Sequence, residues 1–231
     1  MIFNQRTENE HIRDQSTQNR HRIRRADSWV ELSRREGISD DEKFIALWIA
    51  FNSAYGDEGS RLNSEDREYV ESYRFMNFLK EIVDRDEDGV IGDTLWNRHS
   101  PIVIGLVGNK YIYEPYWDWV RKGMPEDHDW QARFKRDTSR VNEELKPHRN
   151  RNVGTVLRLV FNRLYTLRNQ VFHGGTTYAV GVGRGQIQDG AILMSILVPA
   201  ILDVMRCDIA MNPDSDIWGT LAYPTHPRNA S

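Results

Sequence analysis

The feature that most constrains the fold is an apolar stripe within residues 152–173. Apolar residues recur there at intervals of three and four, which places them on one side of an α-helix. Gly174 follows directly, and a glycine there can adopt the left-handed conformation that ends many helices. The spacing therefore predicts a helix over 152–173 that packs against a core. The stripe consists of Val153, Val156, Leu157, Val160, Phe161, Leu164, Leu167 and Val171.

The same helical period recurs elsewhere in the chain. Residues 39–55 begin with Ser39, a good N-cap residue, and acidic side chains follow in the first turn, where the helix dipole favours negative charge. Alternating β-branched patterns are scarce, and a glycine-rich loop or short hairpin is expected over 174–185. The pattern predicts an all-α fold. Further helices are predicted over 21–36, 64–86, 129–146 and 186–211, with two or three shorter ones within 87–123.

The chain length of 231 residues suits one large domain or two small ones. No internal repeat is visible. Residues 1–20 are polar and have almost no apolar period, so we predict a flexible N-terminal tail. A single helical domain is predicted over 21–211, followed by a C-terminal tail over 212–231.

The composition and the apolar segments indicate in which cellular compartment the chain is expected. The net charge of −3 indicates neither a nucleic-acid binder nor a membrane binder, and Cys207 is the only cysteine, so no intrachain disulfide can form. The N-terminus lacks the apolar core of a signal peptide. The most apolar run, residues 191–205, is shorter than the roughly 20 residues of a membrane span and contains Pro199. We expect a buried core helix there, no membrane association and a cytoplasmic location.

The last turns of the 152–173 helix carry Arg168, Asn169 and His173. Asn169 and His173 share a face, whereas Arg168 and His173 lie roughly 140° apart around an ideal helix. Imidazole exchanges protons near neutral pH, and guanidinium binds phosphate in a bidentate manner. If all three side chains enter one cleft, they suit phosphodiester cleavage, with the arginine offsetting charge on the phosphorane. The structural alternative is that both cationic residue types stabilise the helix dipole.

The segment "RNQVFH" (168–173) resembles the signature of HEPN domains. In this signature four to six residues separate an arginine from a histidine, and the first of them is polar. Here four residues intervene. The segments "FIALWIAFNSAYG" (44–56) and "LYTLRNQVFHGG" (164–175) resemble the Apea-like branch of the family, as does a glycine-bearing loop before a last apolar helix. The resemblance spans residues 21–211.

This resemblance implies a helical bundle, here with additional helices, and a metal-independent endoribonuclease without a cofactor. Sites of this family commonly form where two domains meet about a two-fold axis, which would make this chain a homodimer. One His173 would activate the ribose 2′-hydroxyl, and the second would protonate the leaving 5′-oxygen. Two Arg168 side chains would hold the phosphate of the RNA, and Asn169 would orient the arginine or the histidine. Such proteins often act as toxins or in defence against phage, so a separate antitoxin or regulatory protein is a possible partner.

Further residues are candidates for binding RNA. Arg158 and Arg163 precede Arg168 at five-residue steps, and Gln170 lies within the motif. A basic belt of this kind would steer phosphates toward the site, but it could equally be a solvated helix face paired with acidic neighbours. Asn52, within an apolar helix, either supports the motif from behind or tethers the core. Upstream members of the belt are Lys135, Arg136, Arg140, Lys146, Arg149 and Arg151.

Two other functions remain open. One is a non-catalytic HEPN module that binds nucleotides or protein partners. The other is a scaffold dimer with residues 113–123 as its contact surface, although Trp117 and Trp119 in this stretch also suit core packing. No metal site is predicted, because the acidic stretch that begins at Asp84 has Leu95 where a calcium loop needs a glutamate.

Overall fold

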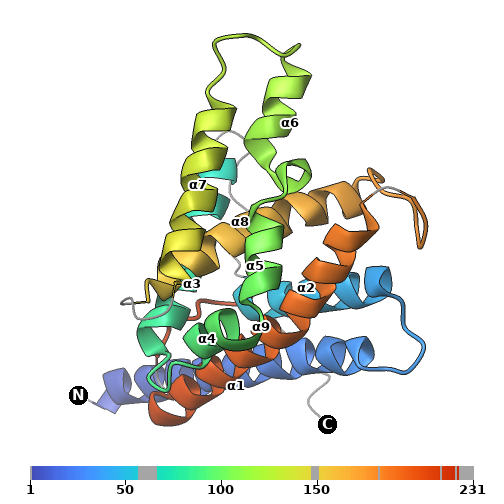
Figure 1. Ribbon diagram of the computed structural model, residues 1–231. Coiled ribbons are helices and arrows are strands. Elements are labelled where there is room, and N and C mark those ends of the chain that lie inside the picture. Colours follow the sequence, from blue (N-terminus) through green and yellow to red (C-terminus); the bar gives the residue numbers. More distant parts are fainter. Residues whose placement is uncertain are drawn as a thin grey trace.

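The computed structural model describes residues 2–56, 67–146, 151–181, 183–213, 215–221 and Tyr223. Within these ranges the chain forms nine α-helices and no β-strand, so the predicted all-α class is confirmed (Figure 1). Short π- and 3-10 helices join some of them.

Three helices form the base of the fold. α1 (Ile2–Ser33) packs along α2 (Asp40–Tyr55), and α2 packs against α9 (Arg184–Met211) (Figure 1). The predicted capping of α2 is confirmed, because the Ser39 hydroxyl accepts a hydrogen bond from the Glu42 N–H at 3.3 Å. The Glu42 carboxylate in turn accepts from the Ser39 N–H at 2.9 Å, which completes a capping box.

α8 (Val153–Phe172) carries the apolar stripe through the core, and the predicted helix over 152–173 is confirmed. Most residues of the stripe are fully buried. The helix ends as the sequence predicts, since Gly174 has a φ of +72°. The N–H groups of Gly175 and Gly174 donate to the carbonyls of Gln170 (2.7 Å) and Val171 (3.3 Å), the Schellman pattern that closes a helix.

The remaining helices connect and extend this core. The region 87–123 is divided into more pieces than predicted, because proline and glycine interrupt it, and the predicted start of α3 at Ser64 lies outside the described residues. These helices are α3 (Arg67–Arg85), α4 (Val90–Asp93), the π-helix η2 (Thr94–Arg98), α5 (Ser100–Val107), the 3-10 helix η3 (Lys110–Ile112), α6 (Glu114–Arg121) and α7 (Trp130–Glu144).

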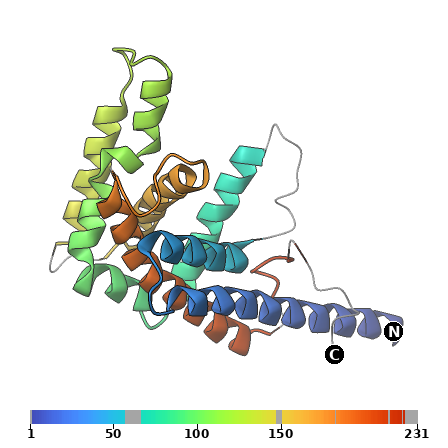
Figure 2. The ribbon, with the colours of Figure 1, turned by 90° about the vertical axis from the view of Figure 1, so that its right-hand side faces the viewer.

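α6 and α7 form a hairpin that extends away from the base of the fold (Figures 1 and 2). The hairpin has its own aromatic cluster, in which the ring of Trp130 lies 5.1 Å from Tyr116 and 5.5 Å from Trp119. The indole N–H groups of Trp117 and Trp119 donate to the carbonyls of Tyr111 (2.8 Å) and Pro125 (3.1 Å). The Trp119 indole is therefore bonded within this hairpin, and the Trp117 indole is bonded to the 3-10 helix that precedes it.

The structure differs from the tails predicted over 1–20 and 212–231. α1 begins at Ile2 and buries a line of polar side chains, including Gln15, Asn19 and Arg22. The Arg22 guanidinium donates to the carbonyls of Ala54 (2.9 Å) and Gly219 (3.0 Å). The apolar period failed to reveal this part of the helix because buried residues such as Gln15 and Asn19 are polar.

The C-terminal segment completes the same contact. Trp218 is buried in the core, and its indole N–H donates to the Asp208 carboxylate at 2.9 Å. Gln15 donates to the Gly219 carbonyl at 3.2 Å, and the Gln18 side chain accepts from the Leu221 N–H at 2.9 Å. Residues 215–221 therefore belong to the folded unit together with α1.

α9 corresponds to the core helix predicted over 186–211 and includes Pro199 within it. In the described part of the chain it is the one helix long and apolar enough to cross a membrane on length and composition alone. Within the fold, 61% of its most apolar window is buried, which fits packing against the other helices.

Candidate functional site

The predicted motif lies at the C-terminal end of α8. Asn169 accepts a hydrogen bond through Oδ1 from Nη1 of Arg168 at 2.9 Å, and the Arg168 guanidinium carbon lies 4.8 Å from the centre of the Phe172 ring. His173 is the C-cap residue and is exposed, and its backbone N–H donates to the Asn169 carbonyl at 3.0 Å. Asn169 and Phe172 thus orient the guanidinium from within the same helix.

Arg168 and His173 do not enter one cleft within a single chain. Arg168 forms part of the wall of a large cavity, whereas neither Asn169 nor His173 contributes to that wall. This division follows from the angle of roughly 140° between positions five apart on a helix. The imidazole is left at the surface beyond the cavity.

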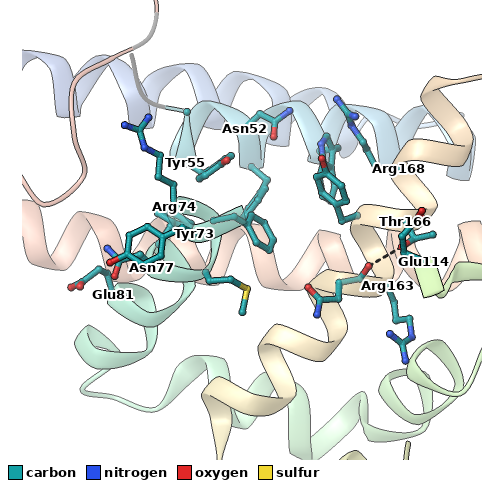
Figure 3. A pocket seen from close by; sticks show the side chains of 18 of the residues that line it. Asn52, Tyr55, Tyr73, Arg74, Asn77, Glu81, Glu114, Arg163, Thr166 and Arg168 are labelled. Atoms are coloured by element: carbon teal, nitrogen blue, oxygen red, sulfur yellow. Dashed lines mark hydrogen bonds between the residues drawn. The ribbon is translucent and has the colours of Figure 1, made fainter. Parts of the chain in front are cut away.

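The cavity has a volume of about 670 Å³, within the range of small-molecule sites. Residues of α2, α3, α7, α8, the start of α6 with the preceding Tyr113, and the C-terminal segment 217–219 line it. In Figure 3, α2 with Asn52 and Tyr55 lies between α3, which carries Arg74 and Glu81, and the end of α8, which carries Arg168. The wall therefore combines aromatic rings, amides and charged side chains.

Asn52 faces this cavity and is half-buried. Its side chain has no hydrogen-bond partner among the described residues, which argues against the core-tether interpretation because a tether needs such partners. Asn52 and Arg168, which are 116 positions apart, therefore lie in the wall of one cavity.

Arg163 is enclosed by the fold and is only 2% exposed. Its Nε donates to the Val107 carbonyl at 3.2 Å, its Nη2 lies 3.5 Å from Asp137, and its guanidinium carbon lies 4.1 Å from the centre of the Tyr113 ring. Burial lowers the pKa of Arg163, and the nearby Asp137 carboxylate opposes this shift. The fold thus holds the guanidinium in place, although Arg163 also belongs to the cavity wall, and the RNA contact predicted for it stays a prediction.

Arg158 does not belong to the cavity wall. It contributes to a shallow groove beside α3, together with Lys80 and Arg151. The predicted belt of Arg158, Arg163 and Arg168 is thus divided, because Arg163 and Arg168 belong to the cavity wall and Arg158 belongs to the groove. Since the groove is separate from the cavity, Arg158 and Arg168 do not form one continuous basic surface.

The upstream basic residues fall into two groups, and Arg149 lies outside the described residues. Lys146 pairs with Glu143, and Arg151 pairs with Asp93 at 2.6 Å, as the salt-bridge interpretation predicts. Arg136 and Arg140 have no ion-pair partner in the part of the chain that the structure describes. Arg136 also belongs to the cavity wall.

The side chain of Gln170 forms a hydrogen bond within the fold. Its Nε2 donates to the Tyr111 carbonyl at 2.5 Å and so connects the end of α8 to η3. This bond occupies the amide donor that the predicted RNA contact could use, although the side chain is only half-buried.

The loop after the motif is connected to the start of α2. Arg184 forms a bidentate ion pair with Asp41, in which Nη1 lies 2.8 Å from Oδ1 and Nη2 contacts Oδ2. Arg184 also donates to the Thr177 carbonyl at 3.4 Å, and Tyr178 donates to the Glu42 carboxylate at 3.3 Å. The hydrogen bonds from Arg184 lower the pKa of Asp41 below its ordinary value.

Asn162 is a cavity residue that sequence reasoning missed. It is an asparagine within an apolar helix, and this signal, which identified Asn52, would also have identified Asn162. Among the described residues, no group of three or more histidine, cysteine or acidic side chains is arranged to hold a metal ion.

Comparisons with known proteins identify no relative of this chain. No protein family matches the chain, no curated protein matches its sequence, and no solved structure matches its fold.

Proposed function

We propose that this protein is a metal-independent endoribonuclease of the HEPN type, which cleaves RNA at a composite site formed by two copies of the chain. The observation that carries the proposal is the end of α8. There Asn169 and Phe172 hold the Arg168 guanidinium in place, while the His173 side chain is exposed at the C-cap of the same helix. A fixed cation and an accessible imidazole are the groups that this reaction needs.

The chemistry is a transesterification at phosphorus. One His173 removes the proton from a ribose 2′-hydroxyl, and the 2′-oxygen attacks the adjacent phosphorus. The second copy's His173 donates a proton to the 5′-oxygen as its bond to phosphorus breaks. The Arg168 side chains offset the charge of the phosphorane. The products are a 2′,3′-cyclic phosphate and a free 5′-hydroxyl.

A second copy of the chain would supply the second proton-transfer group that one chain lacks. Arg168 and His173 diverge within one protomer, so two protomers facing each other about a two-fold axis can contribute both proton-transfer groups to one phosphate. Exposed apolar side chains near the motif, Phe172 (44% exposed) and Tyr178 (62%), would be covered in such a dimer.

The cellular role that goes with this activity is that of a toxin or an anti-phage defence protein in the cytoplasm. RNA would be its substrate, and a separate antitoxin or regulatory protein would restrain it. The RNA cleaved by such a protein must be accessible to the exposed end of α8.

An RNA cleavage assay in excess EDTA tests the proposal with the wild type, His173→Ala and Arg168→Ala. We expect wild-type cleavage that leaves 2′,3′-cyclic phosphate ends. Loss of a proton-transfer group lowers such rates by about 10²–10⁴-fold, so His173→Ala should be almost inactive. Circular dichroism and sizing must first confirm that both variants are folded and have the oligomeric state of the wild type. Equal cleavage by all three proteins would reject the assigned residues, and activity in a strict monomer would reject the composite site.

The second candidate is a module of the same family that binds nucleotides or a protein without cutting. The position of Arg168 in a cavity that excludes His173 favours this candidate, because a ligand there would contact the arginine alone. Binding without cleavage by the wild type, over a range of RNAs, would distinguish it from the nuclease.

A further inference from the structure

The cavity beside Arg168 has walls suited to a flat ring. Tyr55, Phe75 and Tyr165 contribute aromatic side chains, and the Tyr55 and Phe75 rings meet edge to face at 5.7 Å. Tyr73 stands exposed on the α3 side of the cavity (Figure 3). Aromatic walls of this kind stack against nucleobases with little dependence on sequence.

Two amides in the wall can form hydrogen bonds with a ligand. Asn52 of α2 and Asn162 of α8 both line the cavity, and neither side chain has a hydrogen-bond partner in the described part of the structure. An amide offers both a donor and an acceptor, which is the pattern that the edge of a base presents. Half-buried amides beside aromatic rings suit a ligand with polar edges.

The charges of the wall favour an anion. Each of the three carboxylates that the described residues contribute to the wall is already paired: Glu81 with Arg85, Glu114 with Arg121 and Asp137 with Arg163. Arg136 has no ion-pair partner among the described residues, and Arg168 contacts only uncharged groups of its own helix. Among the described residues of the wall, the guanidinium groups of Arg136 and Arg168 therefore remain for a phosphate.

We infer that this cavity is a nucleobase subsite for single-stranded RNA, in which one unstacked base inserts between the aromatic walls while its neighbouring phosphate lies at Arg168. The inference rests on the proposed nuclease function and specifies the form of its substrate. A base within a duplex is stacked and paired, so only a single-stranded or extruded nucleotide can enter a cavity of this kind.

The first test measures binding of the four nucleoside 3′-monophosphates to the full chain, with ribose 5-phosphate as the ligand that lacks a base. Trp48 lies in the cavity wall, so tryptophan fluorescence can report binding, and calorimetry can confirm it. Base stacking contributes about 1–3 kcal/mol, so we expect at least one nucleotide to bind roughly tenfold more tightly than ribose 5-phosphate. Equal affinities, or no nucleotide binding, would overturn the inference.

The second test uses substitutions that keep the side-chain volume. Asn162→Leu should flatten the preference among the four bases, and Asn52→Leu on a different helix tests the same wall if the first variant does not fold. Asn142→Leu is the matched control, because Asn142 is exposed on α7 and lies outside the cavity wall. An unchanged order of affinities in both cavity variants would reject the subsite.

The outcomes separate this inference from the nuclease proposal. Nucleotide binding that depends on Asn162 without any RNA cleavage would support the base subsite and reject the nuclease. Cleavage by the wild type with unchanged base preference in both asparagine variants would support the nuclease and reject the subsite. His173→Ala should abolish cleavage and leave nucleotide affinity unchanged, since His173 is outside the cavity wall.

Discussion

The middle of α8 and its C-terminal end each carry an arginine, and the surroundings of these two residues differ strongly. Arg163 is enclosed, donates to the Val107 carbonyl and lies beside Asp137 and the ring of Tyr113. Arg168 is half-buried, and its contacts within the described residues are with Asn169 and Phe172 of its own helix. The partners of Arg163 come from three other elements of the fold, whereas those of Arg168 lie within one turn.

This difference indicates how the two charges are used. A buried charge must be paired and hydrogen-bonded, so Arg163 serves to join α8 to α5, to the segment before α6 and to α7. The charge of Arg168 is not neutralised by any carboxylate within the described ranges and faces the cavity. Stability should therefore depend on the middle of the helix, and ligand binding on its end.

The largest expected effect on stability comes from Arg163→Ala. Its loss leaves Asp137 and the Val107 carbonyl without their partner, and breaking such a buried pair costs about 3 kcal/mol of unfolding free energy. Arg168→Ala removes a short-range hydrogen bond and a ring contact and should cost about 0.5 kcal/mol. Urea unfolding followed by circular dichroism measures both values. Equal losses in the two variants would remove the distinction between the middle and the end of α8.

The sequence predicted the regular helices because their apolar residues follow the helical period. α2, α8 and α9 were found with small errors at their ends, and the Ser39 cap and the Gly174 terminus follow from local chemistry. The part of α1 before residue 21 was missed because it has almost no apolar period, and its buried residues Gln15 and Asn19 are polar. Its partner, the segment around Trp218, is distant in sequence, so no local pattern reveals the contact.

The candidate site was predictable only in part. The residues at the end of α8 could be selected for their chemistry, and Asn52 for its unusual surroundings. The burial of Arg163 depends on α5 and α7, which no local pattern places. The direction of each arginine could have been worked out from the rotation per residue, which separates positions 158, 163 and 168 by roughly 140° each. The cavity itself requires three-dimensional packing of α2, α3 and α8.

A substitution at the contact between α8 and α9 tests how the end of α8 is positioned. A Cβ at Gly190 would lie 2.7 Å from Cδ2 of Leu167, the residue before Arg168, and 3.2 Å from the Phe44 ring. Gly190→Ala should cost about 2 kcal/mol through overpacking, since α8 must move away from α9. Urea unfolding gives the stability, and RNA cleavage reports whether Arg168 has shifted. Gly185→Ala, at a position of α9 with no neighbour within 4 Å of the added Cβ, is the control. A stability equal to the wild type would mean that Leu167 adjusts without moving the helix.

A smaller effect than that of Gly190→Ala is expected in the loop beyond the motif, which Asp41 and Arg184 connect to α2. Because Arg184 holds the pKa of Asp41 below its ordinary value of 3.8, the ion pair stabilises the fold at higher pH and loses this contribution as the pH falls through the lowered pKa. Asp41→Asn should therefore cost about 1 kcal/mol at neutral pH, with Arg184 still able to contact solvent. Unfolding measured from neutral to acidic pH should show the wild type and the variant converging below pH 3.8. Asp40→Asn, one position earlier and without an ion-pair partner among the described residues, should lose less stability at neutral pH. A constant difference between wild type and Asp41→Asn at every pH would mean that the carboxylate stabilises this end of the molecule by packing and not by its charge.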